Sequence, residues 1–540
     1  MKMATQLRDA PAGLRFLISM GNKCFPRLRL NRDLWYKSLV LVLTFMAYTC
    51  YHMNRKPISV FKNVINRNCS DLVPPPGQDI DPNDDTWCDW APFDQEGSDG
   101  LLGALDSAFL FAYALAMFAS GFVAERVNLR YFLAMGMMLS GIASYLFGLA
   151  RFLDIHHLSY FVIVQVFGGI VQTSGWPGVV TVVGNWFGKS KRGFIFGVWN
   201  SHTSLGNILG TTLAGYYVER DWGLSFMMPG LVMGICGLVI FMFLAPHPVN
   251  VGCGRPTHLQ EASESTGSVN APGRVRSQVS FPSDADTVTS NSSSIDDPDL
   301  IEDESPESSR LLQPDGTSLS GDRPHKAIGF LGALRIPGVI EFSMSLFFSK
   351  LVSYTFLYWL PKYIKTATSL SPRQSADLST LFDVGGIIGG IMAGVISDYS
   401  GMSATTCSGM FILTVPMLFM YQAYGNENMG TNILLLMLCG LLVNGPYALI
   451  TTAISAELGT HHSLEGNSRA LATVTAIIDG TGSIGAAIGP FVAGLVAPYG
   501  WNNVFYILMG ANIMALLFLC RIVVAENQRF LRTRRGTWTA

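Results

Sequence analysis

Apolar segments of roughly 20 residues, separated by short polar turns, repeat along most of the chain. About 20 apolar residues are needed for a helix to cross a bilayer, so each segment predicts a transmembrane helix. We expect spans at about 35–65, 100–124, 130–151, 158–186, 192–217 and 223–246, and then at about 336–364, 373–397, 403–424, 430–456, 467–496 and 501–523. The pattern predicts an all-α membrane protein with twelve transmembrane helices in two six-helix bundles.

Composition supports this class, because 49% of the 540 residues are hydrophobic and 14% are charged, whereas soluble domains carry about 25% charged residues. A Ser-, Asp- and Glu-rich linker separates the two bundles and is expected to stay unfolded. The net charge of −2 and the absence of a basic patch give no indication of a nucleic-acid partner. The expected parts are a tail at 1–33, a bundle at 34–246 with a polar loop at about 66–99, the linker at 247–328, a bundle at 329–524 and a tail at 525–540.

Loop charges predict the orientation in the membrane. The loop at about 66–99 holds many acidic residues and a single basic one, Arg67, whereas both tails are basic. Basic segments stay in the cytosol, so we expect both termini there and the acidic loop on the lumenal side. Cytosolic ends require an even number of spans, which twelve satisfies.

The acidic loop carries a glycosylation sequon, Asn68-Cys69-Ser70. We expect glycosylation of Asn68, because the lumenal side is where the modifying enzyme acts. Cys69 and Cys88 share this loop and are candidates for a disulfide in an oxidising lumen. The nine cysteines have no metal-binding spacing, so neither a metal site nor a cofactor is predicted.

A short motif occurs in both halves of the chain. Gly121 is followed four residues later by Glu125 and then Arg126, and Gly394 is followed by Asp398. Each copy has a glycine for close helix approach and an acid that can cap or pair at a cytosolic gate. Because the copies follow the second and the eighth predicted spans, they indicate a duplicated six-helix unit.

Two adjacent cations end the first apolar run, in Tyr51-His52-Met53-Asn54-Arg55-Lys56-Pro57. A charge in the hydrocarbon costs roughly three to more than ten kcal/mol, so buried Arg and Lys usually mark a substrate or an ion partner. The residues after Pro57 are apolar again, which favours one helix kinked at the proline with Arg55 inside the membrane. The alternative is that the span ends at Tyr51 and both cations reach the headgroups.

Twelve spans, cytosolic ends, a central linker and the paired motif resemble the major facilitator superfamily. A closer resemblance is carried by the stretches 51–56, Gly175-Trp176-Pro177, Asn185-Trp186-Phe187, Trp199-Asn200-Ser201-His202 and Gly500-Trp501. In these stretches the chain is similar to the organophosphate:phosphate antiporters, in particular to the sugar-phosphate exchangers related to the glucose-6-phosphate transporter. This resemblance implies alternating-access exchange of a sugar phosphate, first of all glucose 6-phosphate, for inorganic phosphate in the endoplasmic reticulum membrane.

The resemblance also implies roles for individual residues. Arg55 matches the phosphate-binding arginine of the first helix, and arginine suits a phosphate dianion through bidentate recognition. Lys56 matches a cation that pairs with an acid of the eighth helix, which is Asp383 here. Such a pair would join the two halves, and the alternative is that the two groups never meet.

The chain departs from the family pattern at three cation positions. The family's second cation in the seventh span falls on Ser353, and we expect Lys350, one turn earlier, to replace it. A lysine common in the second span is Met117 here. The family's histidine in the fifth span falls on Thr203, so His202 is either a ligand or a packing residue.

Other polar side chains in the predicted spans suit either a sugar site or contacts between helices. Among them we expect Tyr51, Asn200 and Tyr354 to bind substrate. Four titratable residues, Asp106, Asp383, Asp479 and His202, leave open a proton-coupled carrier of another organic anion. No Ser-His-Asp, His-Glu-x-x-His or P-loop pattern lies at a plausible depth, so a transporter rather than an enzyme is expected.

Overall fold

The computed structural model describes residues 10–24, 31–65, 90–94, 97–124, 126–187, 192–218, 220–254, 330–459 and 470–538. Every element in these ranges is a helix. The helices belong to one compact unit, which is formed by Met1–Ala262 and Ala327–Ala540.

The first half of the unit contains six long helical spans, two of which are interrupted. The first span consists of α3 and α4, and the fourth consists of α7 and α8. The bounds are α2 (Ala12–Cys24), α3 (Arg32–Met53), α4 (Pro57–Ile65), α5 (Ser98–Ala124), α6 (Leu129–Phe152), α7 (Leu158–Gln172), α8 (Gly175–Trp186), α9 (Arg192–Val218), α10 (Trp222–Phe243) and η2 (Pro248–Val251).

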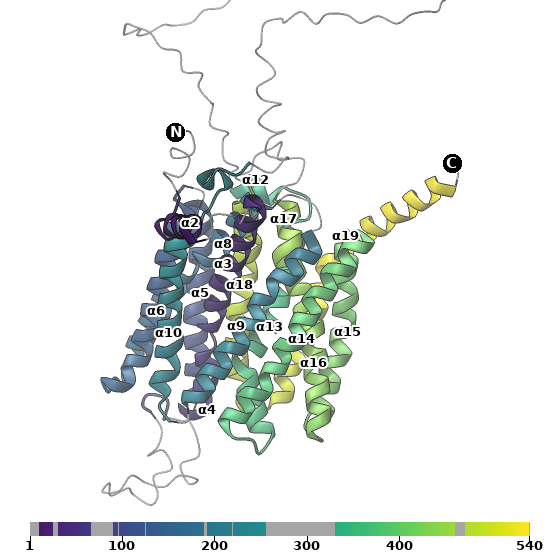
Figure 1. The fold of residues 1–540 in the computed structure, drawn as a ribbon. Helices are drawn as coiled ribbons and strands as arrows, with labels where there is room; N and C mark the ends of the chain where they lie inside the picture. Colours follow the sequence, from purple (N-terminus) through teal and green to yellow (C-terminus); the bar gives the residue numbers. More distant parts are fainter. Residues whose placement is uncertain are drawn as a thin grey trace, which may run out of the picture. The chain divides into compact units, whose positions relative to one another are not determined.

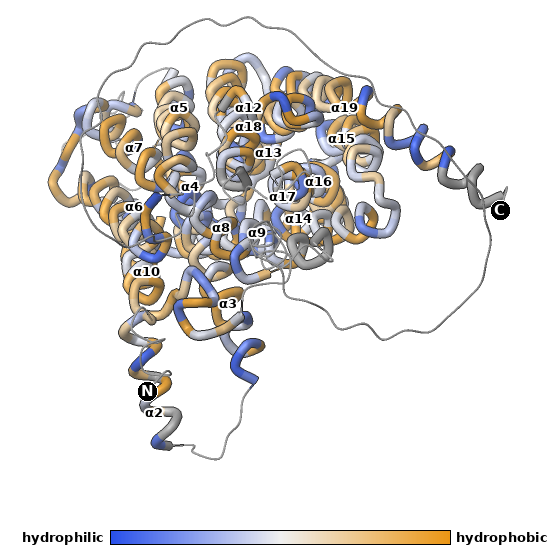
Figure 2. Tube along the Cα trace, turned by 90° about the horizontal axis from the view of Figure 1, so that it is seen from above, coloured by the Kyte–Doolittle hydropathy of each residue, from blue (hydrophilic) through white to orange (hydrophobic). Residues whose placement is uncertain are grey.

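The second half repeats the arrangement with α13 to α19. The bounds are α12 (Phe330–Leu334), α13 (Val339–Ala367), α14 (Pro372–Ser400), α15 (Ser403–Tyr424), α16 (Met429–Leu449), η3 (Ile450–Ile454), α17 (Ser455–Leu458), α18 (Ala470–Val496), η5 (Ala497–Tyr499) and α19 (Trp501–Trp538). The long helices stand side by side (Figure 1), and seen from above the two halves form two neighbouring groups (Figure 2). The halves meet where α5 packs along α18 and α9 packs along α14.

Ten helical segments of the described residues are long and apolar enough to cross a membrane. Outside this set, α9 and α13 are of similar length, at 27 and 29 residues, and carry polar residues within their spans. Their polar residues, such as Asn200 and Lys350, are buried between helices rather than facing lipid. With these two helices the structure has an element at each of the twelve predicted spans, and the predicted all-α membrane fold is confirmed.

The first span is interrupted at residues 54–56, immediately before Pro57. Proline lacks an N–H and disturbs the preceding helical turn, and here the N–H of Arg55 bonds to His52 O at 3.1 Å instead of continuing the α-helical pattern. The chain becomes helical again at Pro57, as the sequence predicts. The break carries Arg55 and Lys56, which are 4% and 2% exposed and therefore lie in the protein interior rather than at its surface.

Glycines allow the closest helix approaches in the second half. A Cβ atom on Gly385 of α14 would lie 2.0 Å from Met437 O of α16. A Cβ atom on Gly485 of α18 would lie 2.0 Å from Phe347 O of α13. The glycine-rich runs are therefore helix-packing surfaces, as their position inside apolar spans predicts.

The folded part extends beyond two of the predicted boundaries. Residues 248–254, placed in the linker by the sequence, are described in the structure; η2 buries Val251, and Arg32 donates to Val251 O at 2.6 Å. At the other end α19 continues past residue 524 to Trp538. Glu526 accepts from the N–H groups of Ala404 and Thr405, both at 2.9 Å, and so caps the start of α15. The linker residues 255–329 lie outside the described residues.

Candidate functional site

Arg55 lies at the helix break, between the two halves of the molecule. Its Nε donates to Gln172 Oε1 at 2.7 Å, and its Nη1 donates to the hydroxyl of Tyr354, on the other half, at 3.3 Å. The guanidinium carbon lies 4.7 Å from the ring centre of Tyr113. These contacts hold the guanidinium plane, while Nη2 is buried without a hydrogen-bond partner.

No ion pair formed among the described residues includes Arg55. Three other buried cations each have an acid partner: Lys56, Lys62 and Lys350. A buried charge without a partner is strongly unfavourable, so a site that retains one is built for a ligand of opposite charge. Arginine presents several N–H donors in a fixed plane, which suits the oxygen atoms of a phosphate.

Lys56 and Asp383 lie close together across the two halves. The Lys56 Nζ is 3.9 Å from Asp383 Oδ2 of α14 and donates to Leu357 O of α13 at 3.0 Å. The other carboxylate oxygen, Oδ1, accepts from the amide of Asn207 at 2.8 Å. Both ionic side chains are buried. The two groups that the resemblance pairs are therefore brought together by the fold.

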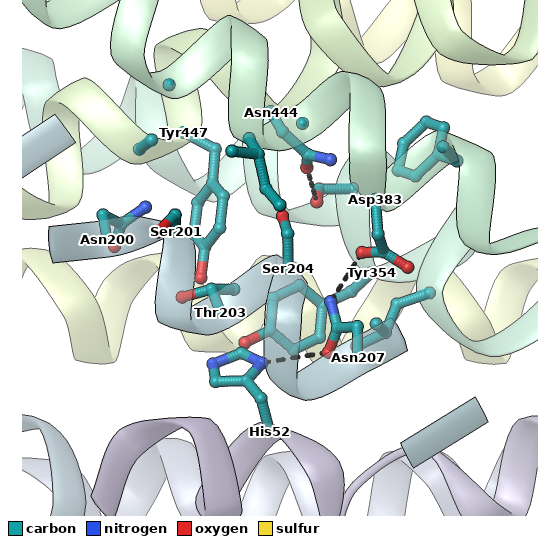
Figure 3. Close-up of a pocket in the computed structure, with 17 residues that line it drawn as sticks. His52, Asn200, Ser201, Thr203, Ser204, Asn207, Tyr354, Asp383, Asn444 and Tyr447 are labelled. Carbon is teal, nitrogen blue, oxygen red and sulfur yellow. Dashed lines mark hydrogen bonds between the residues drawn. The ribbon is translucent and has the colours of Figure 1, made fainter. Parts of the chain in front are cut away.

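A polar cavity opens between α3, α9, α13, α14 and α16 (Figure 3). On one side Asn207 bridges His52 and Asp383, with 3.2 Å between His52 Nδ1 and Asn207 Oδ1. On the other side Ser353 donates to Asn444 Oδ1 at 2.7 Å. Side chains that line the cavity include His52, Asn200, Ser201, Thr203, Ser204, Asn207, Ser353, Tyr354, Asp383, Asn444 and Tyr447.

Most of these lining side chains are uncharged hydrogen-bonding groups. Hydroxyls and amides both donate and accept, so they match the hydroxyls of a sugar. Tyr354 connects this cavity to the cation, because it lines the cavity and accepts from Arg55. Of the residues predicted to bind substrate, Asn200 and Tyr354 line the cavity and Arg55 adjoins it.

Lys350 lies beside the cavity but is engaged within its own half. Its Nζ donates to Asp479 Oδ1 at 2.6 Å and to Ser483 Oγ at 3.2 Å. The ammonium is 5.8 Å from the ring centres of both Tyr354 and Tyr447. Arg55 and Lys350 therefore approach the same tyrosine, Tyr354, from opposite halves.

Tyr51 and His202 lie inside the first half and do not line the cavity. The hydroxyl of Tyr51 is 2.7 Å from Ser174 Oγ. The ring of His202 is fully buried and packs edge-on against Tyr48 and Trp199, with centroid distances of 4.8 and 4.5 Å. For His202 the geometry favours packing, the second of the two interpretations left open by the sequence.

A third buried pair, Lys62 and Asp106, has no counterpart among the predicted site residues. Both side chains are fully buried, and the Lys62 ammonium lies 4.0 Å from the ring centre of Trp359 on the other half. Close by, Lys362 pairs with Asp99 across the halves. This end of the interface is therefore joined by charged as well as apolar contacts.

Three residues at these sites were not predicted as site residues from the sequence: Lys62, His52 and Asn207. A signal existed for Lys62, because it interrupts the apolar continuation after Pro57 and the cost of a charge in hydrocarbon applies to it as it does to Arg55. His52 lies only three residues before Arg55 in the sequence. Asn207 carries no signal of its own, since an asparagine in a polar span is usually a contact between helices.

The repeated motif lies away from the cavity. Gly121 and Gly394 are buried in α5 and α14, and Asp398 is in the last turn of α14. Arg126 follows α5, and its Nη1 donates to Phe122 O at 2.8 Å. None of these four motif residues lines the cavity.

Four further residues of interest, Glu125, Asn68, Cys69 and Cys88, lie outside the described residues. The end of the polar loop is described, and it is anchored to the bundle. Phe93 is fully buried and its ring packs against that of Phe61, with 6.2 Å between the ring centres.

Several proteins are similar in sequence to this chain over most of its length. The mouse glucose-6-phosphate exchanger SLC37A2 is 53% identical over 496 residues, which cover 92% of this chain and 94% of the relative. The human protein of the same name is 53% identical over 497 residues, with the same coverage. The mouse glucose-6-phosphate exchanger SLC37A1 is 48% identical over 540 aligned positions, covering 96% of each chain.

The family description that matches is Major Facilitator Superfamily, over residues 44–468. This match includes both halves and the interface where Arg55, Lys56 and Asp383 meet. The predicted resemblance to this superfamily and to its sugar-phosphate exchangers is confirmed by these relatives. The chain belongs to the major facilitator superfamily and is an integral, multi-pass membrane protein.

Proposed function

We propose that this protein exchanges a sugar phosphate, with glucose 6-phosphate as the first candidate, for inorganic phosphate by alternating access. The observation that carries the proposal is Arg55, buried between the halves, without an acid partner in the described structure and with Nη2 unpaired. The names of the relatives support the same substrate class, because both are called glucose-6-phosphate exchangers.

The two substrates would share one cation. The phosphate group of either ligand binds at Arg55, where it neutralises the buried guanidinium. The sugar hydroxyls then lie toward the polar cavity, within reach of groups such as Asn200, Ser353 and Asn444. Inorganic phosphate makes the first interaction without the second. Either ligand neutralises Arg55, so the protein can change conformation with either one bound. Transport of one ligand across the membrane is then followed by return of the protein with the other, and this cycle is exchange.

Contacts between the halves near the start of α5 would break and re-form in each cycle. Lys365 donates to Asn63 O at 2.7 Å and Lys62 donates to Tyr358 O at 3.3 Å, both across the interface. The pair of Lys362 and Asp99 lies at the same end. Opening this end requires all three contacts to separate, so it corresponds to one gate of a rocking-bundle transporter.

We place the protein in the endoplasmic reticulum membrane, with both termini in the cytosol and the acidic loop in the lumen. The distribution of loop charges supports this orientation. In Figure 1 α2 and the C-terminal end of α19 lie at the same end of the bundle, opposite the end of α4. Glycosylation at Asn68 and a disulfide between Cys69 and Cys88 belong to the same proposal.

Reconstitution tests the exchange directly. Purified protein in proteoliposomes preloaded with inorganic phosphate should take up labelled glucose 6-phosphate and return it chemically unchanged. Uptake should require internal phosphate and should not respond to a pH gradient. Uptake that follows the proton gradient without internal phosphate would instead support a proton-coupled carrier of an organic anion. A panel of phosphorylated sugars in the same assay ranks the substrates.

Asp479 holds Lys350 in the absence of substrate, so its removal should make phosphate binding tighter. We expect Asp479→Asn to lower the Kd for inorganic phosphate by about tenfold, because the freed ammonium becomes a second cation beside Arg55. Equilibrium binding of labelled phosphate to the purified protein measures this. Structural damage does not improve binding, so a gain is specific to the proposed role.

A matched control is Asp33→Asn, which breaks the exposed pair with Lys37 and lies outside the polar cavity. Its Kd for phosphate should stay within about twofold of the parent value, which corresponds to a change in binding free energy of less than about 0.5 kcal/mol. An unchanged or weaker Kd in Asp479→Asn would mean that Lys350 takes no part in phosphate binding.

A further inference from the structure

A second cavity, of about 490 Å³, lies where α6 begins and α10 ends, beside α2. Figure 2 places α2 next to α10 at the edge of the first half, away from the interface between the halves. The lining residues are Ala10, Ala12, Arg15, Asn128, Arg130, Tyr131, Phe241 and Asn250. They come from four separate parts of the chain, and none of them lines the central cavity.

The polar part of this cavity is positively charged. Arg15 and Arg130 contribute two guanidinium groups, and no acid is among the lining residues. Neither arginine takes part in an ion pair that the structure forms within its described ranges. Two asparagines, Asn128 and Asn250, complete the polar wall.

The guanidinium of Arg130 is held in a fixed orientation. Its Nη2 donates to the hydroxyl of Tyr131 at 3.0 Å, and its carbon lies 4.8 Å from the ring centre of Tyr131 and 5.9 Å from that of Phe241. Its Nε is buried without a hydrogen-bond partner. A planar donor held by two rings, with one N–H unsatisfied, is prepared to receive an anionic oxygen.

An exposed apolar surface continues from this cavity along α6 and α10. Tyr131 and Phe241 are themselves partly exposed, and Met135 and Leu238, about one turn further along each helix, are 60% and 53% exposed. In a multi-pass membrane protein such a surface faces lipid. A molecule that fills the cavity and also covers this surface must therefore be anionic at one end and apolar at the other.

We propose that this cavity binds the headgroup phosphate of an anionic phospholipid, with its acyl chains along α6 and α10. Arginines between helices at the edge of the bilayer are suited to such headgroups. A free phosphate would make the same contacts with the two arginines, but it would leave the adjoining apolar surface uncovered. The apolar continuation therefore favours the lipid.

The test compares full-length protein in nanodiscs of phosphatidylcholine with and without phosphatidylinositol. Native mass spectrometry of the released protein should show retained phosphatidylinositol, and the apparent affinity should fall at least about tenfold in the double variant Arg15→Gln/Arg130→Gln. The matched control is Arg151→Gln, at the opposite end of α6 and outside this cavity, where it lies 5.0 Å from the ring centre of Trp90. This control should retain the lipid as the parent protein does.

If the double variant does not fold, Arg130→Lys serves in its place, because it keeps the charge but loses the planar donor and should weaken retention severalfold. Equal retention in the parent and the arginine variants would overturn the proposal. So would inorganic phosphate alone binding in detergent with the same dependence on Arg15 and Arg130, which would identify a free-anion site. Both results leave the proposed exchange activity untouched, because that activity is measured separately.

Discussion

Arg55→Lys should reduce the exchange of glucose 6-phosphate for phosphate by about 100-fold while leaving the protein folded in the membrane. The arginine donates to Gln172 and Tyr354 and still has Nη2 free. A lysine keeps the charge but loses the fixed planar array of donors. Each hydrogen bond to a charged group is worth about 1.5–3 kcal/mol, and 1.4 kcal/mol corresponds to a factor of ten.

Initial rates in phosphate-loaded proteoliposomes measure this effect, and size-exclusion chromatography of the purified variant checks its folding. Arg151→Lys is the matched control, since Arg151 is exposed at the end of α6 and lies outside the central cavity. Its exchange rate should stay within about twofold of the parent rate, which is under 0.5 kcal/mol. Normal transport by Arg55→Lys would mean that the buried arginine is a structural residue and that phosphate binds elsewhere.

Reversing one charge of the pair formed by Lys56 and Asp383 should abolish exchange, and reversing both should restore part of it. Lys56→Asp leaves two buried carboxylates together, and Asp383→Lys leaves two buried cations. Losing one partner of a buried pair costs about 3–5 kcal/mol. The double reversal re-forms an attractive pair, but it loses the donation from Asn207 and the bond to Leu357 O, so recovery should be partial.

The same proteoliposome assay applied to both single variants and the double variant forms a mutant cycle. The pair of Lys37 and Asp33 is the matched control, because its side chains are 38% and 50% exposed. An exposed pair contributes little, so reversing it should change exchange by less than about twofold. Absence of any recovery in the double reversal of Lys56 and Asp383 would remove the bridge between the halves from the mechanism.

The boundaries of the folded part show where local sequence reasoning stops. Residues 525–538 are polar, and residues 248–254 contain one proline and two glycines, so local composition places both segments outside a bundle. They are structured because of distant partners: Arg32 holds the carbonyl of Val251, and Glu526 caps the start of α15. Such contacts join residues more than 100 positions apart, and no local sequence pattern predicts them.

The candidate site likewise combines residues that the sequence could identify with residues that only helix packing could place. The polar residues of α9 and α13 were visible as interruptions of apolar spans, and Asn200 and Tyr354 among them line the central cavity. Which face a polar side chain takes depends on the packing of a helix against its neighbours. His202 and Asn200 are two positions apart on α9, yet His202 packs among aromatic rings while Asn200 lines the cavity.

The sequence by itself determined the membrane class, the spans, the duplicated halves and the presence of costly cations within the first span, because hydropathy and the energy of a buried charge depend on residue type and neighbours in the chain. Tertiary structure decided which cation remains available. Lys56, Lys62 and Lys350 each meet an acid on another helix, whereas Arg55 meets none in the described part of the chain. Charge pairing is a matter of distance in space, and that distance is set only when the helices pack.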